Sequence, residues 1–309
     1  MGKGVSLRRE KPVRNWPDYN AGLKRRFEVS LWLDESVFTL PEASGKRGRP
    51  LCYHDGLIEM LLNLRCLYHL TLRGTEGFAG SLLRLAGLDE QQIPDYSTLS
   101  RRSANLEPVK EVASRSHRIH LVVDSTGLKV YGEGEWKTRQ HGVSKRRTWR
   151  KLHLGVDEQT GKILADDLTE NSTGDQEHLP ALLEQIDEEK TPLRQVSVDG
   201  IYDSYDCYDA ATKKGAQLIC PPRKNAVPKQ TSNHPRHQAI QKCQEKGRKR
   251  WKKETGYHRR SLSETAMFRF KNTFTDKLKA RNLKNQKTEA RIKVNILNIF
   301  NDIAWPAYA

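Results

Sequence analysis

The order of short apolar segments after residue 117 most constrains the fold of this chain. β-Branched apolar runs bounded by Gly, Asp or Pro favour buried strands, and the segments between them have helical spacing. In chain order, the predicted elements are a strand at 118–126, a second candidate strand at 128–136, a hairpin at 151–170 turning at 159–161, a helix at 174–189, a strand at 193–200, a helix at 204–216, a strand at 217–223 and an amphipathic C-terminal helix at 288–305. This order predicts a mixed β-sheet covered by helices.

Two of the predicted strands close on an aspartate. Asp124 ends an apolar run that starts at His120, Asp199 ends a shorter one, and a glycine follows each. A buried strand with function at its carboxyl end has this pattern, whereas a single such aspartate commonly only caps a turn. Asp203 follows Asp199 by four residues, so we expect it to support the same site. Asp157 lies in the predicted hairpin and is interpreted as a turn residue.

The stretch from Tyr257 to Lys271 predicts a helix with a charged face. At about 100° per residue, Tyr257, Arg260, Glu264 and Lys271 fall within roughly 60° of one another. A neighbouring apolar stripe would dock this helix on the core. A carboxylate among cations is commonly a solvated salt bridge. Because two aspartates lie upstream, we interpret Glu264 as a third member of one carboxylate site.

The first 117 residues predict a helical region. Segments 55–70 and 71–87 favour two helices, with Asp55 as a plausible N-cap of the first. Asp95 or Ser97 would cap a third helix that carries Arg101 and Arg102. Two helices, a turn and a basic third helix suggest a helix-turn-helix-like unit that binds DNA through these arginines. A small helical bundle without DNA contacts is the alternative.

The charge of the chain favours a polyanionic partner. The chain has 309 residues and a formal net charge of +16, with 36% hydrophobic residues. Such an excess is most simply explained by nucleic acid. A membrane partner is not expected, because no stretch approaches the ~20 apolar residues of a membrane span. Five scattered cysteines without a C-x-x-C pair predict reduced thiols in a cytoplasm.

A basic run precedes the predicted charged helix. Between Arg223 and Arg260 there are 13 Lys or Arg residues and two acids. A run of this kind is usually solvated and mobile, but beside a carboxylate site we expect it to contact DNA phosphates. Trp251 within it would stack on an unpaired base or serve as a hydrophobic anchor. The residues proposed from this run to contact DNA are Arg248, Lys249, Arg250 and Trp251.

The motifs together resemble those of a known family. The spacing of Tyr257, Arg260, Glu264 and Lys271 resembles the Y-R-E-K signature of DDE transposases from bacterial insertion sequences. VVDSTGLKV around Asp124 and VDGIYDS around Asp199 match the two Asp motifs of that family. PDYSTLSRR at 94–102 and CPPRKNA at 220–226 are similar to the insertion-sequence-five family. The resemblance covers nearly the whole chain.

The resemblance implies a fold and a domain organisation. We expect an α/β, ribonuclease-H-like mixed sheet with flanking helices, preceded by an all-α N-terminal DNA-binding region. The expected division is a helix-turn-helix-like region at 1–117 and a catalytic domain at 118–309 that contains a basic insertion at about 223–256.

The resemblance also implies a chemistry. Asp124, Asp199 and Glu264 would hold two Mg²⁺ ions, with Mn²⁺ able to substitute, because hard cations prefer oxygen ligands. Asp124 would bridge the two ions, which would assist cleavage and transfer of phosphodiesters. Arg260 and Lys271 would grip phosphates, and Tyr257 would orient the backbone or a flanking base.

The expected partners are double-stranded DNA, namely the element's terminal inverted repeats and the target, and a second copy of the chain on that DNA. The expected location is the bacterial cytoplasm, close to the nucleoid. Two alternatives stay open: a metal-dependent nuclease of the same fold without strand transfer, and a non-catalytic DNA-binding regulator. The intact carboxylate triad argues against the regulator, and the Y-R-E-K spacing with the basic insertion favours the transposase over the nuclease.

Overall fold

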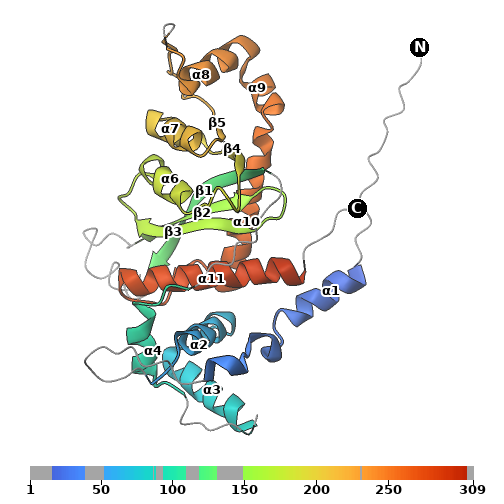
Figure 1. Ribbon diagram of the computed structural model, residues 1–309, viewed down its shortest axis with the longest axis vertical. Helices are drawn as coiled ribbons and strands as arrows, with labels where there is room; N and C mark the ends of the chain where they lie inside the picture. The colour runs from blue at the N-terminus through green and yellow to red at the C-terminus, as the bar shows by residue number, and fades with distance from the viewer. Residues whose placement is uncertain are drawn as a thin grey trace, which may run out of the picture.

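The computed structural model describes residues 16–38, 52–85, 87, 93–108, 118–130, 149–229 and 232–304. In these parts the molecule is elongated, with a sheet in its middle and helices at both ends (Figure 1). One end is the helical N-terminal region. The other is formed by α8 (Pro235–Lys246) and α9 (Arg248–Glu254). None of the helices described is long and apolar enough to pass through a lipid bilayer.

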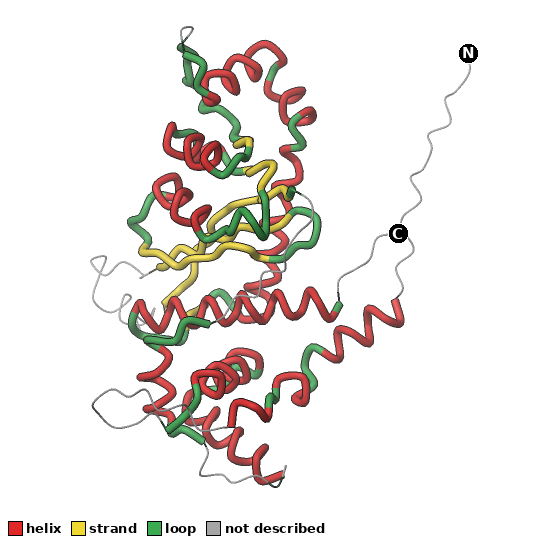
Figure 2. The backbone as a smooth tube through the Cα atoms, in the orientation of Figure 1, coloured by secondary structure: helices red, strands yellow, loops and turns green. Residues whose placement is uncertain are grey.

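The sheet is mixed, as predicted. Its strands follow the order β3-β2-β1-β4-β5, with the short β6 beside β1 (Figure 2). β1, β2 and β3 are antiparallel neighbours, whereas β4 and β6 run parallel to β1, and β5 parallel to β4. The strands are β1 (Ile119–Val130), β2 (Trp149–Asp157), β3 (Ile163–Glu170), β4 (Leu193–Ser197), β5 (Gln217–Ile219) and β6 (Lys277–Leu278).

Helices cover both faces of this sheet. α6 (Asp175–Glu184) and α7 (Tyr205–Lys213) pack on one face, where they share a hydrophobic cluster with β1, β4 and β5. α10 (Ser261–Phe274) and α11 (Leu283–Ile303) pack on the other. The predicted amphipathic C-terminal helix is therefore confirmed as α11. A mixed sheet between these helices is a ribonuclease-H-like α/β fold, and this prediction is confirmed.

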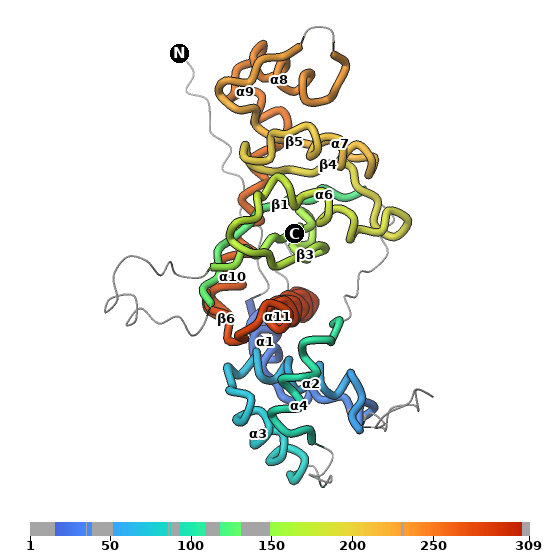
Figure 3. Tube along the Cα trace, turned by 90° about the vertical axis from the view of Figure 1, so that its left-hand side faces the viewer, coloured from blue at the N-terminus to red at the C-terminus, as the bar shows by residue number. Residues whose placement is uncertain are grey.

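The helical N-terminal region shares a core with the sheet domain. α11 lies between the sheet and α2 in two perpendicular views (Figures 1 and 3). One hydrophobic cluster runs from Leu57 on α2 to Phe300 on α11 and Leu128 on β1. The region comprises α1 (Trp16–Arg25), η1 (Val29–Trp32), η2 (Glu35–Phe38), α2 (Asp55–Leu67), α3 (Leu72–Leu85) and α4 (Tyr96–Ser103).

The N-caps of this region show how local sequence starts its helices. Asp95 caps α4 as expected, because its Oδ1 accepts hydrogen bonds from the backbone N–H groups of Ser97 and Thr98. The cap of α2 is His54 and not Asp55: the His54 Nδ1 accepts the N–H of Gly56. The predicted boundary after residue 117 adjoins residues 109–117, which lie outside the described residues, and it stays a prediction.

Three sequence expectations need correction. Residues 128–130 continue β1, so Asp124 lies within a 12-residue strand and does not end it. The helix predicted from Tyr257 begins only at Ser261; a 3-10 turn, η5 (Tyr257–Arg260), precedes it because Gly256 adopts a left-handed φ of 68°. The basic run includes α8 and α9, so much of it is helical rather than mobile chain.

Candidate active site

The β1–β4 ladder brings Asp124 and Asp199 to the same level of the sheet. Its last pair joins Val122 to Ser197, and each aspartate lies two residues further along its own parallel chain. Side chains of β1 are buried up to Val123, and those from Asp124 to Gly127 are partly exposed. The two aspartates therefore flank the place where β4 ends and β1 opens to solvent.

Asp124 is held from two sides. Its Oδ1 accepts the backbone N–H of Ser125 at 2.9 Å, and its Oδ2 accepts Nη1 of Arg260 at 2.7 Å. The hydroxyl of Ser263 approaches Oδ2 at 3.4 Å. Burial raises the pKa of Asp124, and the negative charges of Asp199 and Glu264 add to this rise, against the opposing effects of Ser125 and Arg260. Its ionised form is consequently under-compensated by its surroundings.

Arg260 bridges two of the three predicted carboxylates. Its Nη2 donates to Oε1 of Glu264 at 2.8 Å, one helical turn away. Burial alone would lower the pKa of Arg260, but the neighbouring Asp124 and Glu264 raise it overall. Glu264 is 60% exposed, so it can be reached from solvent, whereas Asp124 is 16% exposed. Arg260 and Glu264 therefore make the contact predicted for one helix face, although Arg260 belongs to η5 and Glu264 to α10.

Asp199 caps a turn and also lies near the other carboxylates. Its Oδ1 accepts the N–H of Ile201 at 2.8 Å and caps η4 (Gly200–Tyr202), which is the turn-capping interpretation. Its charge also acts on Asp124, Arg260 and Tyr257. The thiol of Cys220 donates to the carbonyl of Asp199 at 3.0 Å and fixes this turn against the chain after β5. Capping and proximity to the other carboxylates are therefore compatible.

The donor set suits a hard divalent cation, although its side chains are arranged around an arginine. Three carboxylates close together repel one another without added positive charge, and Arg260 supplies some of it. Over the residues that the structure describes, no three His, Cys, Asp or Glu side chains are placed to hold a metal ion. A cation that joined Asp124 to Glu264 would take the place of the guanidinium that now bridges them.

Residues of the basic run differ in what they offer to a ligand. Trp251 is only 3% exposed, and its ring lies 6.3 Å from that of Tyr257. Because a base cannot stack on a covered ring, the structure favours the hydrophobic-anchor alternative for Trp251. Arg248 donates to the carbonyl of Pro222, and Arg250 forms an exposed i,i+4 pair with Glu254. Lys249 is exposed on the same helix, α9.

Arg101, Arg102 and Lys271, which the sequence predicted to contact DNA, also differ in their surroundings. Arg102 is paired with Asp55 and donates to the carbonyl of Tyr53, so it ties α4 to the start of α2. Arg101 is exposed and donates to Thr98 on its own helix. Lys271 is partly exposed and lies two turns beyond Glu264 on the same side of α10. Arg102 therefore has a structural task that the sequence did not show.

Sequence reasoning missed a group of polar side chains beside the carboxylates. Asp175 accepts the Ser125 hydroxyl at 3.0 Å and lies 3.2 Å from Nζ of Lys151. The phenol oxygen of Tyr202 is buried without a hydrogen-bond partner in the described structure. Burial raises the pKa of Tyr202, and the charges of Asp175 and Asp124 raise it further. The sequence showed Asp175 only as a helix start, because β1–β2 pairing is needed to bring Ser125 and Lys151 to it.

Asp203 and Asp157 have structural surroundings. The Asp203 side chain is fully buried and accepts Nε and Nη2 of Arg236 and the N–H of Arg223. Instead of supporting the carboxylate site, it fastens α8 to the turn after β4. Asp157 accepts the Gln159 N–H and the Thr160 hydroxyl within the β2–β3 hairpin, as expected of a turn residue.

Comparison with known families gives two matches. A family model described as "Transposase DDE domain" matches residues 115–299. A second model with the same description matches residues 24–133. The first match spans the sheet, α6 to α10 and most of α11, and it contains Asp124, Asp199 and Glu264.

Proposed function

The chain belongs to the DDE transposases, and we propose that it cuts DNA at the ends of an insertion sequence and joins the freed ends to target DNA, using Asp124, Asp199 and Glu264 with divalent cations. Membership of the insertion-sequence-five family, through the Y-R-E-K signature, is part of this proposal. Double-stranded DNA is the partner that a transposase requires.

The geometry around Arg260 carries the proposal. Asp124 and Asp199 stand at one level where β4 ends, and Arg260 links Asp124 to Glu264 through two hydrogen bonds of 2.7 and 2.8 Å. Asp199, from the turn after β4, and Glu264, from α10, are thus both close enough for their charges to act on Asp124 of β1, beside the end of β4. A solvated salt bridge on a docking helix would not require Asp124, a mostly buried strand residue, to share its arginine.

The reaction needs no protein nucleophile. In cleavage, water adds to phosphorus and the 3′-oxygen leaves with a proton. In joining, the new 3′-oxygen bonds to a target phosphorus, and the target's own 3′-oxygen leaves with the proton of the attacking hydroxyl. The carboxylates would hold Mg²⁺ or Mn²⁺, which when bound stabilises charge on the attacking and leaving oxygens. Asp124, Asp199 and Glu264 would supply the oxygen ligands of these ions.

The surrounding residues would position the DNA. The guanidinium of Arg260 would contact a phosphate oxygen, to which its planar fork is suited. Lys271 would contact a second phosphate as a point charge. Tyr257, with Lys252 4.9 Å from its ring centre, would orient the backbone or a flanking base. Exposed Lys249, Arg250 and Arg101 would add contacts to the backbone.

We further propose the division of labour that the sequence suggested. Residues 1–117 would read the terminal repeats, and residues 118–309, with the basic segment 223–256, would hold and cut the DNA, as a homodimer on two ends. The shared core around Leu57, Leu128 and Phe300 means that the N-terminal region is better tested by point substitution than by deletion.

Incubation with the element's own ends tests the proposal. Duplexes that carry the inverted repeats flanking the coding region are mixed with the protein and Mg²⁺, and cleavage and joining to a target plasmid are scored separately. We expect both products with wild type and neither with Glu264→Gln, which keeps size and helix propensity but removes the charge. Wild-type cleavage without joining would favour the nuclease, and specific binding without either product would favour the regulator.

A further inference from the structure

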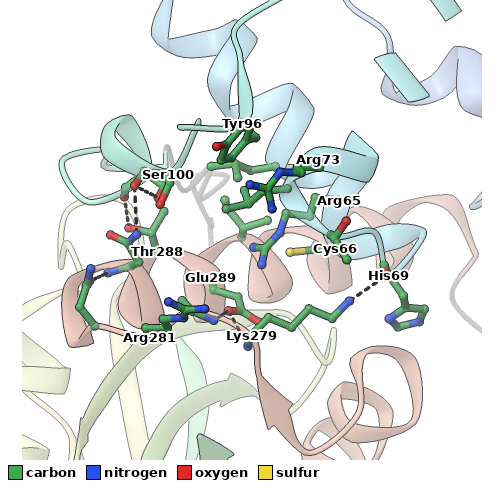
Figure 4. A pocket seen from close by; sticks show the side chains of 18 of the residues that line it. Arg65, Cys66, His69, Arg73, Tyr96, Ser100, Lys279, Arg281, Thr288 and Glu289 are labelled. Atoms are coloured by element: carbon green, nitrogen blue, oxygen red, sulfur yellow. Dashed lines mark hydrogen bonds between the residues drawn. The ribbon is translucent and has the colours of Figure 1, made fainter. Parts of the chain in front are cut away.

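A cavity of about 1110 Å³ lies between the N-terminal helices and the segment that joins β6 to α11. Residues of α2, α3 and α4 form one wall, and residues 275–292 form the other. In Figure 4, Arg65 and Arg73 reach into this space from the N-terminal helices, opposite Lys279 and Arg281. Its volume is slightly above the roughly 300–1,000 Å³ typical of small-molecule sites.

The walls of this cavity carry an excess of positive charge. Its single lining acid is Glu289, among the residues that the structure describes. The lining cations are Arg65, Arg73, Arg101, Lys277, Lys279 and Arg281. Burial lowers the pKa of Lys279, and the nearby charge of Arg65 lowers it further. Cations held close enough to oppose one another's charge favour an anionic ligand.

Arg65 is the buried donor in this wall. The residue is 9% exposed, and its Nε has no hydrogen-bond partner in the part of the chain that the structure describes. Glu289 is close enough for the charge of Arg65 to act on it, but its oxygens accept Nζ of Lys293 and the backbone N–H groups of Lys279 and Ala280, and it forms no hydrogen bond with Arg65 Nε. A buried guanidinium N–H without an acceptor costs free energy, so it indicates a place where a ligand acceptor belongs.

The same cavity offers an acceptor and a ring. The Oδ1 of Asn285 is buried and makes no hydrogen bond within the described structure, although its Nδ2 donates to the carbonyl of Ser100. The ring of Tyr96 is 38% exposed and carries the guanidinium of Arg73 at 4.2 Å. A ligand with a phosphate, a hydrogen-bond donor and a flat base would match these three features, and a nucleotide has all of them.

We propose that this cavity binds a phosphate, with its attached nucleoside, of a DNA strand held by the protein. Arg65 Nε donates to the phosphate, Lys279 and Arg281 add charge, and Tyr96 with Arg73 contacts the base. A DNA strand rather than a free nucleotide is the occupant, because Arg101 extends the positive wall along α4. This assignment rests on the proposed function and adds a DNA contact outside the carboxylate site, because Asp124, Asp199 and Glu264 do not line the cavity.

Arg65→Met tests the assignment, because it removes the donor while keeping much of the side-chain volume. DNA affinity is measured by fluorescence anisotropy on the terminal-repeat duplex in the Glu264→Gln background, where bound DNA is not cut. We expect affinity to fall about tenfold, the size of one lost hydrogen bond to a charged group. The slope of log affinity against log salt should become shallower by about 0.9, the value for the loss of one phosphate contact.

The matched control is Arg84→Met. Arg84 is an exposed residue of α3 that does not line the cavity, so loss of its positive charge should change DNA affinity less than about twofold. The melting temperature without DNA separates binding from folding. The Nε of Arg65 has no acceptor in the described structure, but the charge of Arg65 favours the ionised form of the buried Glu289. Because these two effects oppose each other, Arg65→Met should melt close to the wild-type temperature. A melting temperature several degrees lower would make Arg65 a structural residue and overturn the proposal.

A free nucleotide could occupy the cavity in place of a nucleotide of a DNA strand, and dAMP distinguishes the two. If dAMP raises the melting temperature of wild type but Arg65→Met leaves DNA affinity unchanged, the DNA assignment is overturned. If the Glu264→Gln parent itself fails to bind the terminal repeats, the proposed function fails first. If the parent binds and Arg65→Met binds equally well, only the cavity assignment fails.

Discussion

Asp203 and Asp124 each bind an arginine. The two arginine–carboxylate clusters differ in how fully the hydrogen-bonding capacity of the carboxylate is used. Asp203 is fully buried, and Arg236 grips both of its oxygens, at 2.7 and 3.1 Å, with the N–H of Arg223 as a third donor. Asp124 is 16% exposed and shares Arg260 with the exposed Glu264. A saturated buried pair holds a fold together, whereas an under-compensated carboxylate at an open edge is available for a ligand.

The largest expected effect is the loss of DNA cleavage when Asp124, the under-compensated carboxylate, is replaced. Asp124→Asn should lower the cleavage rate about 10⁴-fold, because residues that serve one site act as a unit. The same substitution should leave the free energy of unfolding unchanged or slightly higher, since burial disfavours the ionised Asp124. Single-turnover cleavage and urea unfolding measure the two effects. A loss of more than about 2 kcal/mol of stability would make Asp124 equivalent to Asp203.

The saturated cluster should show the reverse pattern. Asp203→Asn leaves Arg236 without its full partner, and breaking a buried pair costs about 3 kcal/mol or more. The folded fraction should still cleave at a rate far closer to wild type than Asp124→Asn does. Asp209→Asn is the matched control, because Asp209 is 64% exposed in its contact with His234 and exposed pairs contribute little. An inactive but stable Asp203→Asn protein would show that Asp203 belongs to the reacting site.

Acid should act on the framework that carries both clusters. Burial, chiefly, lowers the pKa of His120 on β1 to about 4, and burial followed by the charge of His178 does the same for His153 on β2. Because the folded pKa lies below the unfolded value of about 6.5, both imidazoles stabilise the fold above that pH. Their contribution is lost as the pH falls from 6.5 towards 4.

His120→Gln tests this pH dependence. It removes one of the two titrations, so stability should fall less steeply over that window, by up to about 1.4 kcal/mol per pH unit. Urea unfolding at pH 7, 6 and 5 measures the slope. His258→Gln is the control, because His258 is exposed on η5. Equal slopes for His120→Gln and wild type would show that this histidine does not set the acid limit.

The smallest expected effects come from single basic side chains. They distinguish a side chain that stabilises the fold from one that is exposed to solvent. Lys249→Ala should weaken DNA binding severalfold and make the log–log salt slope shallower by about 0.9, with little change in stability. Arg102→Ala should mainly cost stability, because Arg102 joins α4 to Asp55 and Tyr53. Binding isotherms at four salt concentrations, beside melting curves, compare them. A flat salt dependence in wild type would remove the basis for any phosphate contact.

The sequence by itself determined the features that depend on neighbouring residues and on the period of the chain. The β-branched runs gave the order of strands and helices. The four-residue spacing of Arg260 and Glu264 sufficed to place them in contact, because one helical turn separates such residues. Asp95 was identifiable as a cap, and Asp157 as a turn residue, for the same local reason. The motifs around Asp124 and Asp199 pointed to the family before the fold was known.

Only the tertiary structure decided which side chains meet across the chain. The Val122–Ser197 register levels Asp124 with Asp199, and no local pattern encodes a register between strands about 75 residues apart. Burial of Trp251, pairing of Asp203 with Arg236, and the unsatisfied Arg65 in a cavity between two regions likewise follow from long-range packing. The sequence shows which residues are charged, but whether each charge is satisfied depends on partners that folding brings to it.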